Sequence, residues 1–389
     1  MHKIERLLQT LAPKGVEFRK LGDIGEYIRG VTYKKNQEIN NLECGIKVLR
    51  ANNITLSNHL NFEDIKVINK NVKIRKEQYL KKNDILICAG SGSSEHIGKV
   101  AFINTDFDYV FGGFMGVIRI REVNSRFVYH IFTSNIFKQY LEKSLNTTTI
   151  NNLNANILQN FLIPIPPLEI QQEIVKILDA FTELNTELKA RKKQYQYYQN
   201  MLLDFNDINS NHKDAKMSAK TYPKRLQTLL QTLAPKGVEF KKIGELFKRN
   251  KGINITAAQM KELHSEIGKV RIFAGGATKA DINYKDISKK DIINCESVII
   301  KSRGNIGFEY YNQPFSHKNE IWSYSSKTNQ MLVKFLYYYL SNNQDYFQKL
   351  AQSSSVKLPQ LSVSDTDEYE VPIPPLEIQQ EIVKILDQF

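Results

Sequence analysis

An exact internal repeat constrains the fold of this chain more strongly than any other sequence feature. Residues 164–179 recur letter for letter as residues 372–387, and residues 7–18 recur as residues 229–240. Between the repeated segments the two halves are largely dissimilar, and the second half is the shorter. Because repeats of this length mark repeated structural units, we predict two tandem units that share a frame and carry different inserts.

The first proline-rich repeat leads into a stretch that predicts one long helix. Pro164, Pro166 and Pro167 favour extended backbone, and a proline is tolerated in the first turn of a helix. Apolar residues then recur at steps of three and four, which is the spacing of a heptad seam. A helix over residues 168–205 would be about 57 Å long, which suits a spacer between two modules. Its seam positions are Ile170, Ile174, Ile177, Phe181, Leu184, Leu188, Tyr195, Tyr198, Leu202 and Phe205, with Arg191 as a polar interruption.

The remaining segments predict an α+β chain with mixed strands and helices in both inserts. Each insert contains strand-like runs, a polar loop with glycine, a helix and then a hydroxyl-rich loop, so we expect one shared skeleton. The expected divisions are a first globular domain over 1–163 with an N-terminal helix over 1–12, a long helix over 164–205, a polar linker over 206–224, a second globular domain over 225–371 and a second, short helix over 372–389.

The amino-acid composition narrows the possible classes of binding partner and the possible cellular compartment. The net charge of +13 favours a polyanion such as nucleic acid, although an AT-rich genome would also raise the lysine content. Three cysteines with no C-x-x-C spacing predict neither a disulfide framework nor a zinc site. No apolar run reaches the roughly 18 residues of a membrane span, and the N-terminus lacks a signal-peptide core, so we expect a cytoplasmic protein and no membrane partner.

The sequence carries no recognisable catalytic or metal-binding constellation. It has no G-x-x-x-x-G-K-[ST] phosphate loop and no H-E-x-x-H pair. Two E-x-K triplets resemble part of a nuclease site, but such triplets are common by chance. We therefore predict no catalytic residue, no metal ligand and no cofactor bound by this chain.

The candidate binding residues are polar side chains in the loops of both inserts. Arginine and lysine suit guanine edges and phosphates, and asparagine suits adenine, so these are the residue types that base recognition needs. Each of them alone could equally be a solvated loop residue, and His317 could be structural. The candidates are Lys34, Lys35, Arg50, Asn52, Asn53, Ser91, Ser93, Thr147 and Thr148 in the first insert, and Lys279, Lys301, Ser302, Arg303, Asn305, His317, Lys318, Asn319 and Ser354 in the second.

The layout resembles the DNA-specificity subunits of Type I restriction-modification systems. The resemblance rests on the duplicated P-I-P-P-L-E-I-Q-Q-E-I-V-K-I-L-D segment at 164 and 372, on L-A-P-K-G-V-E-F at 11 and 233, and on the dissimilar inserts between them. It covers essentially the whole chain. The proline-rich helix start is the specific part of the resemblance, whereas the inserts contribute little to it.

The resemblance implies two target recognition domains that each read one half of a split DNA sequence, separated by two long antiparallel coiled-coil helices in a pseudo-twofold arrangement. It implies no catalysis by this chain. The implied partners are double-stranded DNA, two methyltransferase subunits that use S-adenosylmethionine, and restriction subunits that use ATP and Mg²⁺. A second copy of this chain is a further candidate partner.

Antiparallel pairing would bring the second helix to the end of the first. Ile378, Ile382 and Ile385 should then meet Tyr198 and Leu202. The early seam, near residues 170–184, would lack a partner of the same length. We expect the N-terminal helix, a methyltransferase subunit or a second copy to cover it.

Two other classes of protein remain open from the sequence alone. A coiled-coil scaffold would assemble proteins without reading DNA, and its binding would show no sequence preference. A nuclease with an unrecognised site would cut DNA by itself when a divalent metal is added.

Overall fold

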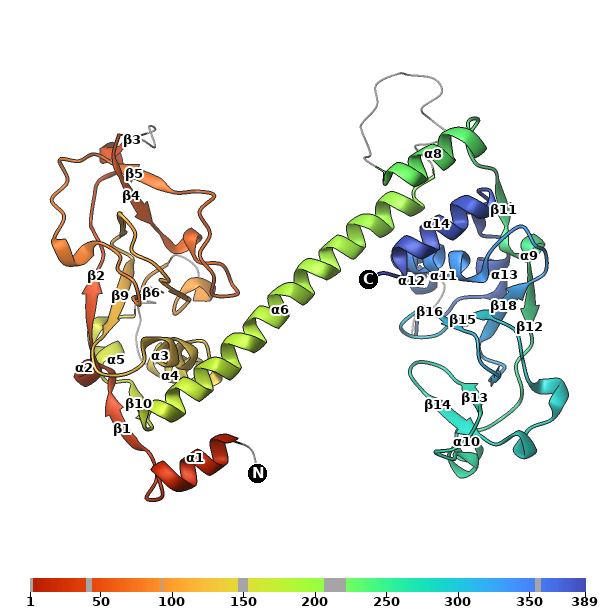
Figure 1. The fold of residues 1–389 in the computed structure, drawn as a ribbon, viewed down its shortest axis with the longest axis horizontal. Helices are drawn as coiled ribbons and strands as arrows, with labels where there is room; N and C mark the ends of the chain where they lie inside the picture. Colours follow the sequence, from red (N-terminus) through yellow and green to blue (C-terminus); the bar gives the residue numbers. More distant parts are fainter. Residues whose placement is uncertain (1–2, 40–43, 92–93, 146–152, 206–221, 354–357) are drawn as a thin grey trace. The chain divides into compact units, whose positions relative to one another are not determined.

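The computed structural model describes residues 3–39, 44–91, 94–145, 153–205, 222–353 and 358–389 (Figure 1). The chain forms two compact units, Met1–Thr186 and Glu187–Phe389, which we call unit 1 and unit 2. The division falls inside the long helix, so each unit includes part of it. Among the described residues, no helix is both long and apolar enough to span a membrane.

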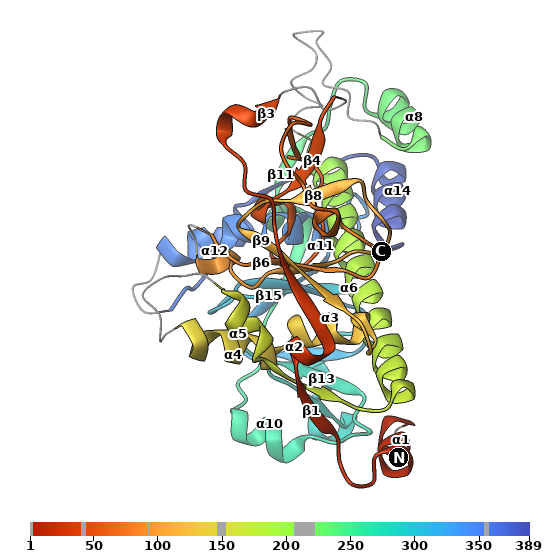
Figure 2. The same cartoon turned by 90° about the vertical axis from the view of Figure 1, so that its left-hand side faces the viewer.

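Unit 1 contains two four-stranded sheets and a two-stranded ribbon. The first sheet has the antiparallel order β2-β9-β6-β7, and Figure 2 shows β9 and β6 side by side. The second sheet has the order β3-β5-β4-β8, in which β4 and β8 are parallel. The ribbon pairs β1 with β10. The strands are β1 (Glu17–Lys20), β2 (Gly25–Arg29), β3 (Glu38–Ile39), β4 (Ile46–Leu49), β5 (Lys66–Ile68), β6 (Ile85–Cys88), β7 (Val100–Phe102), β8 (Tyr109–Phe111), β9 (Met115–Ile120) and β10 (Leu162–Ile165).

The helices of unit 1 cover the first sheet and lead into the long helix. Alternating apolar residues of β6 and β9 face a core that α3 closes on one side, because Phe127, Val128 and Ile131 bury their side chains there. The helices are α1 (Lys3–Leu11), α2 (Leu21–Ile24), α3 (Ser125–Phe132), α4 (Asn135–Leu145), α5 (Ala155–Gln159) and the long helix α6 (Leu168–Leu203).

Unit 2 repeats this topology with a different sequence. Its first sheet has the order β12-β18-β15-β16, its second β14-β13-β17 with β13 and β17 parallel, and its ribbon pairs β11 with β19. The elements are α8 (Lys224–Leu233), β11 (Phe240–Lys242), α9 (Ile243–Leu246), β12 (Phe247–Asn250), α10 (Ala257–Leu263), β13 (Val270–Phe273), β14 (Lys279–Ile282), β15 (Ser297–Lys301), β16 (Gly307–Tyr311), β17 (Phe315–His317), β18 (Trp322–Ser326), α11 (Val333–Asn342), α12 (Gln344–Ser353), α13 (Val363–Asp367), β19 (Glu370–Pro372) and α14 (Leu376–Leu386).

The two orders correspond strand by strand, which confirms that the dissimilar inserts share a skeleton. The difference in length lies mainly in one connection. Residues 50–65 join β4 to β5 in unit 1, whereas residues 274–278 join β13 to β14 in unit 2. Strand β3 has no counterpart among the described strands of unit 2.

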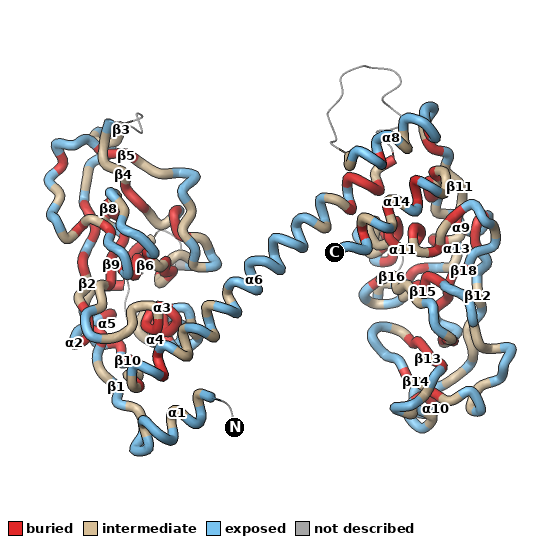
Figure 3. Tube along the Cα trace, in the orientation of Figure 1, coloured by how far each residue is buried: buried red, intermediate tan, exposed pale blue. Residues whose placement is uncertain are grey.

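The predicted long helix forms, and its seam divides into three parts. At the start, Ile170 is buried in the core of unit 1 and Ile174 packs against it, so the insert itself covers the first turns of the early seam. Helix α1 lies against this part of α6 through the ion pair of Lys3 and Glu173 and has no fully buried residue, so coverage of the seam by α1, by a methyltransferase subunit or by a second copy stays a prediction. In the middle, Phe181 and Leu184 are 60% and 61% exposed. Figure 3 shows the middle of α6 coloured mainly as exposed.

The end of the seam packs within unit 2. Leu202, Ile378 and Ile382 belong to one buried core, and Tyr195, Tyr198 and Ile385 pack against it. The rings of Tyr195 and Tyr198 also contact Phe389, at centroid distances of 5.9 Å and 5.4 Å. The predicted meeting of the second helix with the end of the first is therefore confirmed. Of the other seam positions, Ile177 is half-buried and Leu188 is exposed.

Candidate nucleic-acid interface

In unit 1 the loops that carry the candidate residues meet around the short turn between β8 and β9, residues 112–114. Val31 forms a bridge to Gly112, whose N–H donates to the Leu49 carbonyl over 2.9 Å. The N–H groups of Ala89 and Gly90 both donate to the Phe114 carbonyl over 2.9 Å. The turn therefore gathers the loops that follow β2, β4 and β6 into one surface.

The tip of this turn is an exposed aromatic side chain, that of Phe114. It is 75% exposed, although it stands among polar loops. A large exposed apolar side chain in such a place is typical of a binding surface. Residue type alone does not single out Phe114, because a Gly-Gly-Phe run also fits a buried strand or bulge.

Four candidate residues of unit 1 lie in these loops with solvent access. Lys34 and Lys35 are exposed at the start of a short 3₁₀ turn, and Asn52 is exposed beyond β4. Arg50 is half-buried and forms an ion pair with Asp64 at 2.7 Å. Ser91 is half-buried, whereas Ser93, Thr147 and Thr148 lie outside the described residues.

Asn53 serves the internal structure of the long loop over residues 50–65. It is buried, and its carbonyl oxygen accepts from the Arg50 N–H over 2.8 Å. Its amide donates to the Asn61 carbonyl over 2.9 Å and to the Asp64 carbonyl over 3.2 Å. Because its side chain is fully used in this way, we remove Asn53 from the set of candidate base contacts.

Lys99 stabilises the same loop from its buried side. Its ammonium donates to the carbonyls of Ala51 and Ile54, over 3.1 Å and 2.6 Å. Burial lowers the pKa of this amine, and the nearby Cys88 acts in the opposite direction. The loop is thus held by two buried polar side chains, which leaves Asn52 and its neighbours at the surface.

In unit 2 the equivalent turn, residues 318–321, gathers the equivalent loops. Ile253 bridges to Lys318, and the Ser302 hydroxyl donates to the Glu320 carbonyl over 2.7 Å. The Glu320 carboxylate accepts from the Gly275 N–H over 3.2 Å and lies 3.3 Å from the Lys318 ammonium. Burial acts to raise the pKa of Glu320, but these two partners lower it overall.

The tips of the two turns differ in chemistry. Phe114 and Glu320 are each the third residue after their strand, since Gly112 and Lys318 occupy the same bridge position. An exposed phenyl ring in unit 1 thus corresponds to a carboxylate surrounded by donors in unit 2. Glu320 is absent from the predicted candidates as well, because an acidic side chain is not expected in a surface that binds a polyanion.

Most candidate residues of unit 2 also reach solvent. Lys279, Arg303, Asn305 and Asn319 are exposed on three neighbouring loops, and Lys318 is half-buried. Lys301 is half-buried and paired with Glu309 at 2.6 Å. Ser354 lies outside the described residues.

Two residues of unit 2 that were predicted to contact DNA instead form hydrogen bonds inside the protein. Ser302 is buried and uses its hydroxyl on the Glu320 carbonyl. His317 is fully buried, its Nε2 lies 3.2 Å from the Ser323 hydroxyl, and burial lowers its pKa. We remove both from the set of candidate DNA contacts, because a buried neutral imidazole in a sheet core cannot reach a groove.

Within the residues that the structure describes, no group of three or more His, Cys, Asp or Glu side chains is placed to hold a metal ion. In each unit the remaining candidate Lys, Arg and Asn side chains are instead exposed or half-buried at adjoining loops. This arrangement can bind a polyanion and contact base edges.

The chain is similar in sequence to several known proteins. The family described as "Type I restriction modification DNA specificity domain" matches residues 13–195 and 235–389. The chain is 33% identical to the Type I restriction enzyme EcoKI specificity subunit of Escherichia coli, over 47% of this chain and 39% of that protein. It is 24% identical to the StySPI specificity subunit of Salmonella potsdam, over 97% of this chain and 82% of that protein.

A solved structure shares the fold. It is the crystal structure of a Type-I restriction-modification system S subunit from M. genitalium, with a TM-score of 0.54. The match covers 96% of this chain and 90% of that one, at 18% sequence identity.

Proposed function

Since the chain belongs to the family of Type I restriction-modification DNA specificity subunits, we propose that its two units each read one half of a split, asymmetric DNA target. The observation that carries this proposal is the correspondence of the two units. They share one topology, yet their equivalent loop tips carry Phe114 and Glu320. Equal scaffolds with unlike contact surfaces are what an asymmetric bipartite target requires.

The chemistry of the exposed loop residues supports direct reading of bases in both units. In unit 2, Arg303 can donate to guanine and Asn305 can bond adenine, while Lys279 suits phosphate. The Glu320 carboxylate can accept from the amino group of cytosine, because Lys318 and the Gly275 N–H keep it charged. In unit 1, Phe114 offers an apolar contact of the kind that recognises a thymine methyl group.

The length of the long helix supports the proposal that base pairs read by neither unit separate the two half-sites. At 1.5 Å per residue, α6 is about 54 Å long, which suits a rigid spacer of several base pairs more than a domain core. In this proposal the chain itself catalyses nothing and acts in the cytoplasm. Two methyltransferase subunits with S-adenosylmethionine, and restriction subunits with ATP and Mg²⁺, carry out the chemistry.

The test is adenine-methylation mapping on a random-sequence plasmid library, with this chain assembled with a methyltransferase subunit. We expect a split motif. Exchange of residues 243–367 for the insert of a relative should change one half of the motif only, and exchange of the unit 1 insert should change the other.

Two results would contradict the proposal. One is methylation without any motif by a complex that has demonstrably assembled, which would favour a scaffold. The other is a single uninterrupted motif that both exchanges alter. DNA cleavage by the purified chain with a divalent metal would point to the nuclease alternative.

A further inference from the structure

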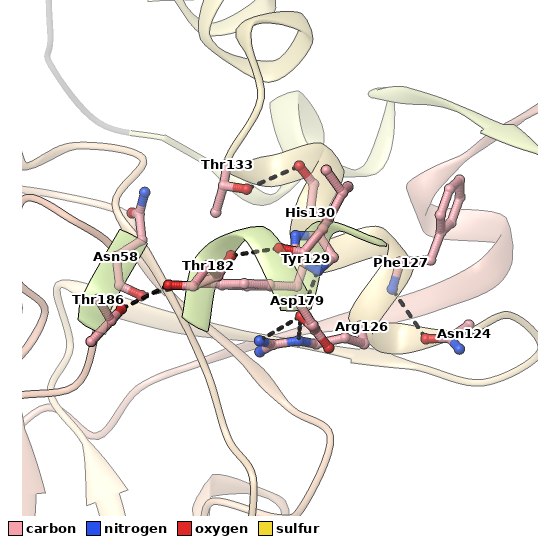
Figure 4. Close-up of polar contacts among 11 residues, drawn as sticks. Asn58, Asn124, Arg126, Phe127, Tyr129, His130, Thr133, Asp179, Thr182 and Thr186 are labelled. Atoms are coloured by element: carbon pink, nitrogen blue, oxygen red, sulfur yellow. Dashed lines mark hydrogen bonds and ion pairs between the residues drawn. The ribbon is translucent and has the colours of Figure 1, made fainter. Parts of the chain in front are cut away.

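The same residue of the repeated segment holds both inserts, although the inserts differ in sequence. In unit 1 this residue is Asp179 of α6. Its Oδ1 lies 2.8 Å from Nε of Arg126 and 2.8 Å from Nε2 of His130, both on α3 (Figure 4). Figure 2 shows α3 beside α6. The carboxylate therefore ties the helix of the frame to a helix of the insert.

In unit 2 the repeated residue is Asp387, at the end of α14. Its carboxylate lies 2.7 Å from Nζ of Lys334 and accepts from the hydroxyl of Tyr338 over 2.5 Å, both on α11. The two partners are four residues apart in each insert helix, so they share one helix face. Arginine and histidine in one insert are thus replaced by lysine and tyrosine in the other, with the same carboxylate between them.

The cation of each pair also stacks on an aromatic ring from the last strand of its sheet. The Arg126 guanidinium lies 4.8 Å from the ring centroid of Phe102 on β7, and Nζ of Lys334 lies 5.6 Å from that of Tyr310 on β16. Cation–π contact and ion pairing together restrict the cation to one place. The sheet, the insert helix and the frame helix therefore meet at one charged group in both units.

A second repeated residue fixes the start of the same insert helix. The side-chain oxygen of Gln171 accepts from the Asn124 N–H over 2.9 Å, and that of Gln379 accepts from the Leu332 N–H over 2.8 Å. Asn124 and Leu332 each stand immediately before their insert helix. Both glutamines are buried, so each unit has two identical fixed points along one helix.

In unit 1 a series of contacts connects Arg126 to a loop of the proposed DNA surface. The ring of Tyr129 lies 4.8 Å from the Arg126 guanidinium, and its hydroxyl donates to the Asn58 carbonyl over 3.0 Å. Asn58 belongs to the loop over residues 50–65, which carries Asn52. A change in the angle between α3 and α6 would therefore move this loop.

We propose that the repeated aspartate and glutamine form a docking clamp that sets the orientation of each insert on its frame helix, and thereby the number of base pairs allowed between the two half-sites. Any insert is compatible with the clamp if it supplies a cation at the position of Arg126 or Lys334 and a hydrogen-bonding side chain four residues later. Asp179 and Asp387 are positioning residues that touch no base. This inference rests on the proposed reading of a split target.

The test varies the spacing between half-sites and leaves their sequences unchanged. The full chain carrying Asp179→Asn, assembled with the methyltransferase subunit, is assayed on targets with the preferred gap and with gaps one base pair shorter or longer. A hydrogen bond to a charged group is worth about tenfold in an equilibrium. We therefore expect selectivity for the preferred gap to fall by about tenfold, with both half-site sequences unchanged.

Four further variants make the test specific. Glu183→Gln removes the same charge from an exposed place one turn further along α6, and it should leave gap selectivity unchanged. The double change Arg126→Lys with His130→Tyr installs the partners of unit 2 and should restore most of the selectivity that Arg126→Gln loses. Asp387→Asn should broaden gap selectivity in the same way from unit 2, which keeps the test open if Asp179→Asn does not assemble.

The clamp is excluded if both aspartate variants assemble and retain the gap selectivity of the unchanged chain. It is also excluded if they alter the base preferences within a half-site. These outcomes differ from failure of the proposed function, in which the unchanged chain itself would show no split motif.

Discussion

Helices α1 and α8 share the sequence L-L-Q-T-L, yet their environments differ. In unit 2, Leu226 of α8 is fully buried in a core that also contains Met201 and Phe205 from the end of the long helix. In unit 1 no residue of α1 is buried, and the helix is attached to α6 by the ion pair of Lys3 and Glu173 at 2.6 Å. The comparison teaches that an amphipathic sequence specifies a helix, whereas the neighbouring chain decides how much of it is buried.

The two units also stabilise equivalent sheets with different polar chemistry. In unit 1, Asp84 is buried and accepts two hydrogen bonds of 2.8 Å from Arg119 of β9. In unit 2, Ser325 of β18 instead joins Asn250 at 2.6 Å and Ser297 at 2.8 Å. One sheet thus depends on a charge pair, and the other on neutral hydroxyl groups.

The largest effect should come from breaking the charge pair of unit 1. Asp84→Ala leaves the Arg119 charge without its partner, and we expect a loss of about 3–5 kcal/mol in the free energy of unfolding of unit 1. Ser325→Ala, the matched change in unit 2, should cost only about 1 kcal/mol. Hydrogen exchange of the amides in β6 and β15 measures the two units separately. Equal losses would show that the two networks are energetically alike.

The next largest effect on stability should come from a substitution in α8, compared with the equivalent substitution in α1. Leu226→Ala opens a cavity in a packed core, so we expect unit 2 to lose about 2–4 kcal/mol. Ile4→Ala, at the equivalent position of α1, should cost less than about 1 kcal/mol. Trp322 is the single tryptophan and shares the core with Leu226, so its fluorescence in urea follows unit 2 alone. A large cost for Ile4→Ala would indicate that α1 is covered in solution.

Substitutions at the two loop tips should have effects of intermediate size, and each should change only one half of the DNA motif. Phe114→Ala and Glu320→Ala should each reduce base discrimination in one half of the motif by about 1–3 kcal/mol and leave the other half unchanged. Methylation mapping reports the base preferences of each half of the motif in a single experiment. Phe18→Ala serves as the control, because it removes another exposed phenyl ring, which lies on β1 and is 61% exposed. A change in both halves from either variant would contradict independent reading by the two units.

The smallest effect concerns pH, because the imidazoles of His130 in unit 1 and His317 in unit 2 are buried. The pKa of His130 is lowered first by burial, with Asp179 opposing that shift, and burial also lowers the pKa of His317. An unfolded histidine has a pKa of about 6.5, so the unfolded chain binds more protons just below that pH. Each unit should therefore lose stability as pH falls from about 7 through 6.5 towards the lower pKa of the folded state.

Exchanging residues between the units tests this pH dependence. His130→Tyr introduces the residue of the other clamp and should make unit 1 less sensitive to acid. His317→Phe introduces the residue that unit 1 has at the same place, because Phe111 and His317 end equivalent parallel strands. Protection factors at pH 7.5 and 5.5 measure both changes. A sensitivity that persists in both variants would have to arise from other groups.

The candidate site was predictable in type but only partly in detail. Exposed Lys34, Lys279 and Arg303 were found because their residue types alone suggest contact with DNA. Asn53, Ser302 and His317 have the same support from residue type, but the structure buries them and uses their side chains internally. Polarity in a loop says nothing about which side chains the loop uses in this way. Phe114 was missed for the converse reason, because apolar residues are expected inside.

The amino-acid sequence was sufficient to predict the two tandem units, the long helix after the proline run, the shared frame and the meeting of the second helix with the end of the first. These follow from exact repeats and helical periodicity, which are local properties of the chain. The folded structure was needed to learn which seam positions are covered, which polar side chains face solvent, and that one repeated aspartate holds two unlike inserts. Burial and ion pairing depend on residues far apart in the sequence, such as Arg126 and Asp179 or Leu226 and Phe205.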